Sequence, residues 1–264
     1  MKKFLVIGNP INHSLSPKLH NFWIKKYNLE GIYNKKKLQQ NGIEKIIKEI
    51  KKGEIDGINV TVPFKKIVIS YLDNITPLAK ETNSVNIVYK KNNNIVGDNT
   101  DVGGFECSLK HIHYNVKDKK VFVLGAGGVS PSIIFALKRL GVSKIFLSNR
   151  TRKKAEDLKK NYPDLEIIEW GDSVDFDMIV NATSLGLEGT DKINLSNKKP
   201  ITNKLFYDVI YNPSKTDFLL NAEKLGNKIV NGKMMFIYQA QLAFKVWHNI
   251  LPKIDTETIK LLNI

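Results

Sequence analysis

The chain has 264 residues, of which 42% are hydrophobic and 25% charged, a composition that excludes collagen-like, coiled-coil and disordered chains. Its formal charge of +15 comes from 38 Lys and 3 Arg against 26 acidic residues, with the lysines spread over the whole length. A phosphate-binding surface would favour clustered Arg with interleaved aromatic residues, so we expect no nucleic-acid partner.

The cysteine count and the hydropathy of the sequence indicate which cellular compartment to expect. Cys107 is the single cysteine, so no intrachain disulfide can form, and no Cys/His cluster has zinc spacing; we expect a cytoplasmic protein without a metal. The N-terminal apolar run ends at Gly8, too early for a secretory signal, and no segment approaches the roughly 18 apolar residues of a membrane span. The sequence predicts a soluble protein with no membrane partner.

In the first half, short apolar runs alternate with amphipathic stretches. Strands are predicted over 4–7 and 57–62, and helices over 17–27 and 64–72. This alternation is typical of an α/β domain with a mainly parallel sheet. The Gly- and Asx-rich stretch 96–104 has no periodicity and is predicted to be a loop at a domain junction.

The second half repeats the alternation more regularly. A helix is predicted over 133–140, and six strands, enough for a Rossmann-type sheet, are predicted over 120–124, 144–148, 166–169, 178–181, 205–209 and 228–230. After Gly232 the pattern is helical to the end, too late for another βα unit. We therefore expect a substrate-binding and catalytic domain, 1–101 completed by 232–264 packing back on it, and a Rossmann domain, 102–231.

The run from Gly125 to Ser130 follows a predicted strand and precedes a predicted helix, as in dinucleotide-binding turns. Gly125 permits a tight turn, and Gly127 lets a pyrophosphate approach the backbone at the helix N-terminus. Ser130 stands where the third glycine of the pattern would fall. A glycine-rich turn without a ligand therefore remains an alternative.

The next strand ends in the segment 149–152, where dinucleotide sites select their cofactor. It contains no carboxylate for an NAD ribose, whereas Arg150 and Arg152, two of the three arginines, could bind a 2′-phosphate with planar donors. NADP is therefore the expected cofactor, and a solvated surface pair is the alternative. The polar segment 181–186 follows the fourth strand, at the edge where ligands bind, although a plain turn explains it equally well.

Polar residues also follow the strands of the first half. Ser16 precedes Pro17 and is predicted to be extended, so that Ser14 and Ser16 could offer hydroxyls to one ligand, unless Ser16 is only a helix N-cap. Asn59 and Thr61 are predicted to share one face of a strand end.

Three further polar residues occur at segment ends. Lys65 is predicted to enter the first turn of a helix, where the dipole disfavours a cation, which suits it to proton transfer rather than capping. Asn86 and Asp101 complete the set. A helix-start lysine in a surface ion pair is the alternative.

Together these motifs resemble the shikimate dehydrogenase family, in the same order over almost the full length. The resemblance rests on Ser14-Leu15-Ser16-Pro17, Asn59-Val60-Thr61-Val62-Pro63-Phe64-Lys65, Val85-Asn86, Asn99-Thr100-Asp101-Val102-Gly103-Gly104, the Gly125 turn, Asn149-Arg150-Thr151, Asn181-Ala182-Thr183-Ser184 and Gln239-Ala240. The chain departs from the family where Met234 replaces a usual glycine, and where Ser130 and Pro131 replace a small residue followed by a basic one.

The resemblance implies that Lys65 and Asp101 are the catalytic pair. It implies that shikimate is bound by Ser14, Ser16, Asn59, Thr61, Asn86, Tyr211 and Gln239. The expected NADP contacts are Gly125, Ala126, Gly127, Gly128, Val129, Asn149, Arg150, Thr151, Arg152, Lys154, Thr183, Val209 and Gly232.

The implied reaction is the reversible, NADPH-dependent reduction of 3-dehydroshikimate to shikimate in aromatic amino-acid (chorismate) biosynthesis. Two alternatives remain at this point: an NAD-using quinate/shikimate dehydrogenase and a non-catalytic, NADP-sensing regulator on the same scaffold. The expected partner is a small-molecule substrate, and both a monomer and a homodimer are compatible with the sequence.

Overall fold

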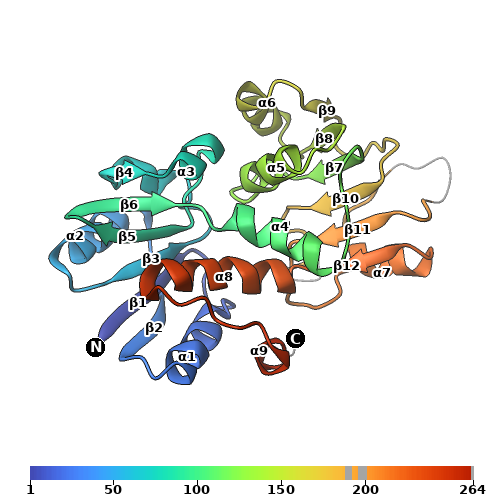
Figure 1. Cartoon of the computed structure of the whole chain (residues 1–264). Helices are drawn as coiled ribbons and strands as arrows, with labels where there is room; N and C mark the ends of the chain where they lie inside the picture. Colours follow the sequence, from blue (N-terminus) through green and yellow to red (C-terminus); the bar gives the residue numbers. More distant parts are fainter. Residues whose placement is uncertain (188–191, 196–200, 263–264) are drawn as a thin grey trace. The chain divides into compact units, whose positions relative to one another are not determined.

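The computed structural model describes residues 1–187, 192–195 and 201–262, which group into two compact units (Figure 1). The first unit is Met1–Gly104 together with the C-terminal stretch that starts at Ile237, and the second is Phe105–Phe236. The chain thus crosses twice between the units, and the expected domain limits, after residues 101 and 231, precede both crossing points.

The first unit contains a six-stranded sheet in the order β2-β1-β3-β5-β6-β4. Its elements are β1 (Lys2–Gly8), α1 (Ser16–Lys26), β2 (Gly31–Lys37), α2 (Ile43–Lys52), β3 (Gly57–Val60), β4 (Asn74–Ile75), α3 (Pro77–Thr82), β5 (Ile87–Lys91) and β6 (Asn94–Asp98), with short 3₁₀ helices at Gln40–Gly42 and Ile67–Tyr71. Three strand pairs are parallel, whereas β5 runs antiparallel to both β3 and β6. The sheet is therefore mixed, although mostly parallel.

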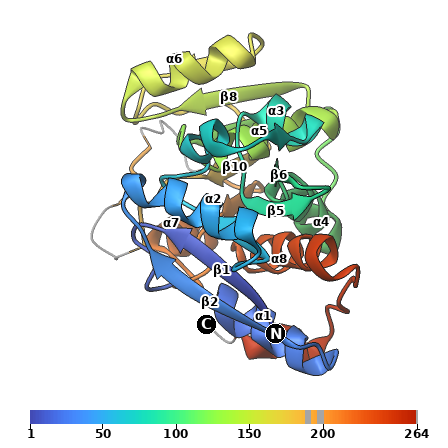
Figure 2. The same ribbon diagram turned by 90° about the vertical axis from the view of Figure 1, so that its left-hand side faces the viewer.

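Alternating side chains of β1 supply both cores of the first unit. Ile7 packs with the isoleucines of α2 on one face of the sheet. Phe4 points to the other face, where its ring lies 4.9 Å from that of Trp247 in α8 (Lys233–His248). Figure 2 shows α2 on the opposite side of the sheet from α1. The period of two along the strand explains why both faces are covered.

The second unit has a six-stranded parallel sheet in the order β12-β11-β10-β7-β8-β9. Its elements are β7 (Lys120–Leu124), α5 (Ser130–Arg139), β8 (Lys144–Ser148), α6 (Arg152–Asn161), β9 (Glu166–Ile168), β10 (Met178–Asn181), β11 (Leu205–Asp208), α7 (Asp217–Lys224) and β12 (Lys228–Val230). This is the doubly wound dinucleotide-binding order, so the prediction of a Rossmann-type sheet is confirmed.

Three further helices lie within the part of the chain that the structure describes. α4 (Asp101–His111) and α8 each begin in one unit and end in the other, and α9 (Thr256–Leu261) follows in the first unit. In the second unit Phe105 of α4 packs edge-on against Tyr207 of β11, with ring centroids 5.2 Å apart. None of the helices within the described residues is long and apolar enough to cross a bilayer.

The predicted loop over 96–104 is wrong. β6 extends to Asp98 because it pairs with β5 as a hairpin, and α4 begins at Asp101. Only Asn99 and Thr100 lie between these elements. The helix was not predicted because Gly103 and Gly104, in the first turns of α4, interrupt the helical pattern of the sequence; glycine has a low helix propensity.

The helix predicted over 64–72 is also wrong, because only the short 3₁₀ helix Ile67–Tyr71 forms there. The carbonyl of Lys65 accepts a hydrogen bond from Val85 N at 2.9 Å, from another segment. This carbonyl therefore accepts its hydrogen bond from outside the segment, and not from the residue four positions later as in an α-helix. Lys65 lies in the turn after β3 and not in the first turn of an α-helix.

Candidate active site

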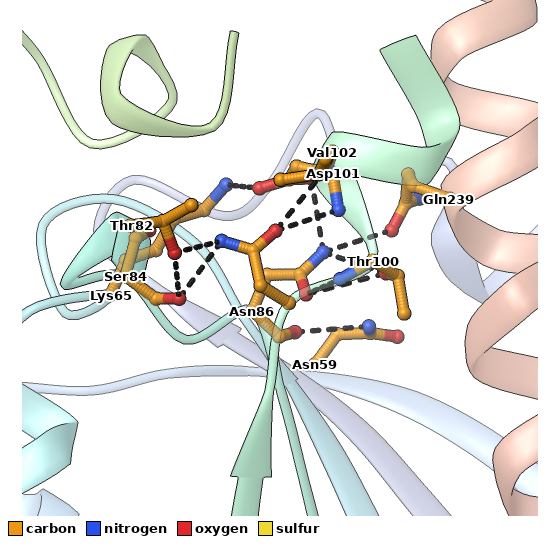
Figure 3. A network of polar contacts seen from close by, with 10 residues as sticks. Asn59, Lys65, Thr82, Ser84, Asn86, Thr100, Asp101, Val102 and Gln239 are labelled. Carbon is orange, nitrogen blue, oxygen red and sulfur yellow. Dashed lines mark hydrogen bonds and ion pairs between the residues drawn. The ribbon is translucent and has the colours of Figure 1, made fainter. Parts of the chain in front are cut away.

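One edge of the first unit's sheet gathers the polar side chains. The parallel strands β1 and β3 end there, β6 ends there because it runs parallel to β3, and the antiparallel β5 begins there. The loop before β5 therefore carries Asn86 to the same edge as the segments that follow β3 and β6, which carry Lys65 and Asp101 (Figure 3). Lys65, Asn86 and Asp101 are distant in sequence, and the directions of their strands bring them to the same edge of the sheet.

Lys65 and Asp101 form a sheltered ion pair. Lys65 Nζ donates to Asp101 Oδ2 over 2.5 Å, and the two side chains are only 11% and 8% exposed. Exclusion of water strengthens such a pair and makes either partner costly to remove. The pair is buried, in contrast to the solvated surface pair that the sequence had left as an alternative.

Asn86 holds the second oxygen of that carboxylate. Its Nδ2 lies 3.0 Å from Asp101 Oδ1, 2.9 Å from Thr100 Oγ1 and 3.5 Å from Gln239 Oε1, and its Oδ1 accepts from Thr100 N at 2.7 Å. Asn59 Nδ2 donates to the backbone oxygen of Asn86 over 3.1 Å. Figure 3 shows these groups around the start of α4. Each amide is thus fixed by several partners, which favours a single geometry.

Asn99 is a positioning residue that sequence reasoning quoted in a motif without giving it a role. Its Oδ1 accepts from the backbone N–H groups of Asp101, at 3.0 Å, and Val102, at 3.3 Å. Its Nδ2 donates to the carbonyl of Ser84 over 2.9 Å. An Asx side chain capping the first N–H groups of a helix is a signal readable from sequence once the helix start is known. Asn99 thereby fixes Asp101 in the first turn of α4.

Ser14 and Ser16 follow β1 at the same edge. Ser14 Oγ donates to Ser16 Oγ over 3.2 Å and accepts from Ser16 N at 3.3 Å. The prediction of an extended Ser16 is wrong, because α1 already begins at Ser16, with Pro17 tolerated in its first turn. The hydroxyls are nevertheless brought together. β3 ends at Val60, so Thr61 lies just beyond the strand.

Tyr211 belongs to the second unit. Its ring stacks on that of Phe236 at 4.6 Å and 29°. Its expected contact with the substrate stays a prediction.

The glycine turn after β7 has an open backbone. Gly125 has φ +103° and donates to Ser148 O over 2.7 Å, so a side chain there would be strained. A Cβ on Gly127 would meet only Ala182 O, at 3.9 Å. Ser130 is fully buried, and its hydroxyl accepts from Gly127 N at 3.1 Å. The serine in place of the third glycine thus closes the turn at the start of α5.

The segment after β8 is tied to this turn. Asn149 Oδ1 accepts from Ala126 N at 2.9 Å, and its Nδ2 donates to Thr151 O over 2.8 Å. Arg150 is exposed at the end of the strand. Arg152 is instead engaged by two carboxylates: its Nε lies 3.0 Å from Glu156 Oε1, and its Nη1 pairs with Glu169. A clamp that uses both arginines would therefore require Arg152 to exchange partners.

The remaining expected cofactor residues occupy the same unit. Thr183 Oγ1 donates to Asn181 Oδ1 over 2.7 Å, and Lys154 is exposed in the first turn of α6. A Cβ on Gly232 would lie 2.0 Å from Val209 O, so that only glycine permits this approach of the two backbones. The pyrophosphate of NADP fits the open glycine turn at the N-terminus of α5. Its 2′-phosphate fits the exposed Arg150, in a segment that has no carboxylate to bind the ribose of NAD.

Asp208 is a buried carboxylate that sequence reasoning missed. It accepts from Thr216 Oγ1 at 2.6 Å, from Asn181 Nδ2 at 3.0 Å and from Ile210 N at 3.0 Å. Burial raises its pKa to about 6 in spite of these donors. Its position at the end of a predicted strand could have identified it, because the loops that bind ligands in parallel sheets start at the carboxyl ends of the strands. It ties together the loops after β10 and β11.

Comparisons with known proteins agree in both units. Residues 6–88 match the family model for the shikimate dehydrogenase substrate binding domain, and residues 108–188 match the model for shikimate / quinate 5-dehydrogenase. The shikimate dehydrogenase (NADP(+)) of Pelagibacter ubique is 57% identical over 263 residues, covering 100% of this chain and 99% of that protein.

Solved structures give the same result for the fold. The crystal structure of shikimate dehydrogenase from Aquifex aeolicus is 35% identical, with a TM-score of 0.88 over 98% of this chain and 96% of that one. Shikimate 5-dehydrogenase from Thermus thermophilus, solved in complex with NADP(H) and shikimate, is 30% identical, with a TM-score of 0.86 over 98% and 97%.

Proposed function

The chain belongs to the shikimate dehydrogenase family, and from that membership we propose that it interconverts 3-dehydroshikimate and shikimate with NADP in aromatic amino-acid (chorismate) biosynthesis. It is an oxidoreductase that acts on a CH–OH group. The observation that carries the proposal is the buried Lys65–Asp101 pair at the polar edge of the first unit's sheet.

NADPH, when bound, supplies the hydride for the ketone carbon. The task left to the protein is to hold the carbonyl and to provide a proton for the oxygen that becomes the hydroxyl. Lys65 as an ammonium donates that proton and stabilises the developing negative charge. In the oxidative direction the neutral amine accepts the hydroxyl proton.

Asp101 orients the amine. One oxygen accepts from Lys65 Nζ and the other from Asn86 Nδ2, so that the carboxylate cannot rotate without breaking both bonds. A lysine side chain has many rotamers, and fixing one of them beforehand lowers the entropy cost of reaching the reactive geometry. The pair therefore acts as one proton-transfer device.

Shikimate offers a carboxylate and three hydroxyls, which need several directed hydrogen bonds. Ser14 and Ser16 present paired hydroxyls, while Asn86, Gln239, Asn59 and Thr61 supply amide and hydroxyl groups near the dyad's edge of the sheet. Tyr211 is assigned to the same pocket through the family resemblance. These residues bind the substrate, whereas Lys65 and Asp101 act on the reacting oxygen.

The open turn at Gly127 and the N-terminus of α5 are assigned to the pyrophosphate, and exposed Arg150 to the 2′-phosphate. Because Arg152 already has two carboxylate partners, Arg150 is the principal reader of the phosphate. This arrangement favours NADP over NAD. The cytoplasmic location and the choice between a monomer and a homodimer stay proposals that the sequence raised.

The deciding experiment follows absorbance of the reduced nicotinamide with shikimate and with quinate, each with NADP and with NAD. Reduction of NADP that depends on shikimate, and is lost in Lys65→Met, supports the proposal. Preferred use of NAD with quinate would favour the quinate-using alternative. Binding of NADP without turnover of either substrate would favour a non-catalytic sensor.

A further inference from the structure

A buried tyrosine stands behind the substrate edge of the first unit. Tyr33, in β2, is fully buried, and its hydroxyl donates to Asn59 Oδ1 over 2.6 Å. Asn59 is itself only 6% exposed, and its Nδ2 donates to the backbone oxygen of Asn86. Tyr33 is thus hydrogen-bonded to Asn59, and Asn59 to the backbone of Asn86, whose side chain in turn donates to the Asp101 carboxylate.

The tyrosine is held rigidly by two consecutive residues of α1. The ring of His20 stacks on the Tyr33 ring with centroids 4.2 Å apart and planes within 5°. Asn21 clamps the Tyr33 backbone: its Oδ1 accepts from Tyr33 N at 2.9 Å, and its Nδ2 donates to Tyr33 O over 2.8 Å. Ring and backbone are therefore both fixed, so the hydroxyl reaches Asn59 from a set direction.

The hydroxyl decides which way the Asn59 amide points. An amide has a donor end and an acceptor end of nearly the same shape. With the Tyr33 hydroxyl donating to Oδ1, the NH₂ group must face Asn86 O, and its second hydrogen stays available. Without that hydroxyl the buried Oδ1 would lose its donor, and the reversed amide would set its oxygen against the Asn86 carbonyl.

We propose that Tyr33 is a positioning residue for the substrate site, which acts through Asn59 by fixing the orientation of its amide. The inference rests on the proposed function, because Asn59 is assigned to shikimate only there. Tyr33 itself neither touches the substrate nor moves a proton. Its effect is expected on the binding of shikimate and not on the binding of NADP.

The test is a double-mutant cycle on the full chain, with Tyr33→Phe, Asn59→Ala and their combination. Tyr33→Phe should raise KM for shikimate about five- to tenfold, the loss of one buried hydrogen bond, and leave KM for NADP unchanged. In the Asn59→Ala background the second substitution should raise KM no further. Tyr27→Phe is the matched control, because the Tyr27 hydroxyl accepts from Lys253 N at 3.0 Å in the same unit, away from Asn59.

The readout separates positioning from stability. Partial unfolding lowers the amount of active enzyme and hence the maximal rate, but leaves KM unchanged, so the measurement holds even if Tyr33→Phe is less stable. An unchanged KM for shikimate in Tyr33→Phe, or an equal rise with and without Asn59, would overturn the inference while leaving the proposed function intact. A parent protein that does not oxidise shikimate would overturn the proposed function and this inference with it.

Discussion

Substitutions in the Lys65–Asp101 pair separate the catalytic role proposed for it from a purely structural one. Lys65→Met keeps much of the side-chain volume but leaves Asp101, 8% exposed, without its cation. Breaking a buried pair from one side costs about 3–5 kcal/mol, because a charge stays buried and uncompensated. Asp101→Asn should cost a similar amount by leaving Lys65 unpaired.

The double variant Lys65→Met/Asp101→Asn contains no unpaired charge, and its amide oxygen can still accept from Asn86 Nδ2 as the Asp101 carboxylate does. Most of the lost stability should therefore return, since replacing a whole buried pair is often neutral. At about 2–4 °C per kcal/mol for a chain of this size, each single variant should melt roughly 10 °C below the parent and the double variant close to it. Differential scanning calorimetry measures this.

Activity should not return with stability. If Lys65 delivers the proton, all three variants should show a kcat lowered by about 10²-fold or more, with shikimate binding comparatively intact. Steady-state kinetics with NADP and shikimate give the comparison. A double variant that regains both its melting temperature and its turnover would refute the reasoning and leave the pair a structural one.

Four further outcomes are expected. Arg150→Ala should raise KM for NADP far more than KM for NAD, and equal losses in steady-state kinetics would remove Arg150 from phosphate recognition. Ser14→Ala should weaken shikimate by about 1.5–3 kcal/mol, the cost of a hydrogen bond to a charged group, with kcat nearly unchanged; a fall in kcat alone would contradict this. His20 is buried and neutral, and burial lowers its pKa from 6.5 to about 3, so its contribution to the stability of the folded state should fall by up to about 2 kcal/mol as pH falls from 6.5 to 5, and urea titrations of His20→Phe should lack this change. Asp208 acts with the opposite sign: burial raises its pKa to about 6, so its contribution should rise by about 1 kcal/mol between pH 6 and 5 and offset part of the loss from His20. Asp208→Asn should therefore lose about 1 kcal/mol more than the parent over this range, and an equal change in both proteins would exclude Asp208 as the source.

Local sequence patterns were sufficient to predict the strands and the topology of the second unit. Each strand of its sheet is an apolar run bounded by turn residues, and the chain order of such runs with intervening helices leaves few topologies open, because crossover connections between parallel strands are right-handed. The β7 strand, the Gly125 turn and the helix beginning at Ser130 were therefore readable from sequence.

Periodicity was insufficient for the first unit. The antiparallel hairpin of β5 and β6 contains Gly97, Asp98 and three consecutive asparagines, which local propensity assigns to a loop. Pairing with β3 overrides that propensity. Likewise the pattern over 64–72 suggested a helix, but the use of the Lys65 carbonyl by Val85 is a contact between segments that no local window contains.

The identities of the site residues came from the sequence, and their relations came from the fold. Polar residues at segment ends marked Lys65, Asn86 and Asp101, but composition and spacing cannot show which oxygen of Asp101 faces the amine or that Asn86 holds the other. Those contacts depend on the directions of three strands. Tyr33 carried no signal at all, because a single tyrosine in the mostly polar segment 31–37 indicates no function by itself, and only the burial of its hydroxyl beside Asn59 distinguishes it.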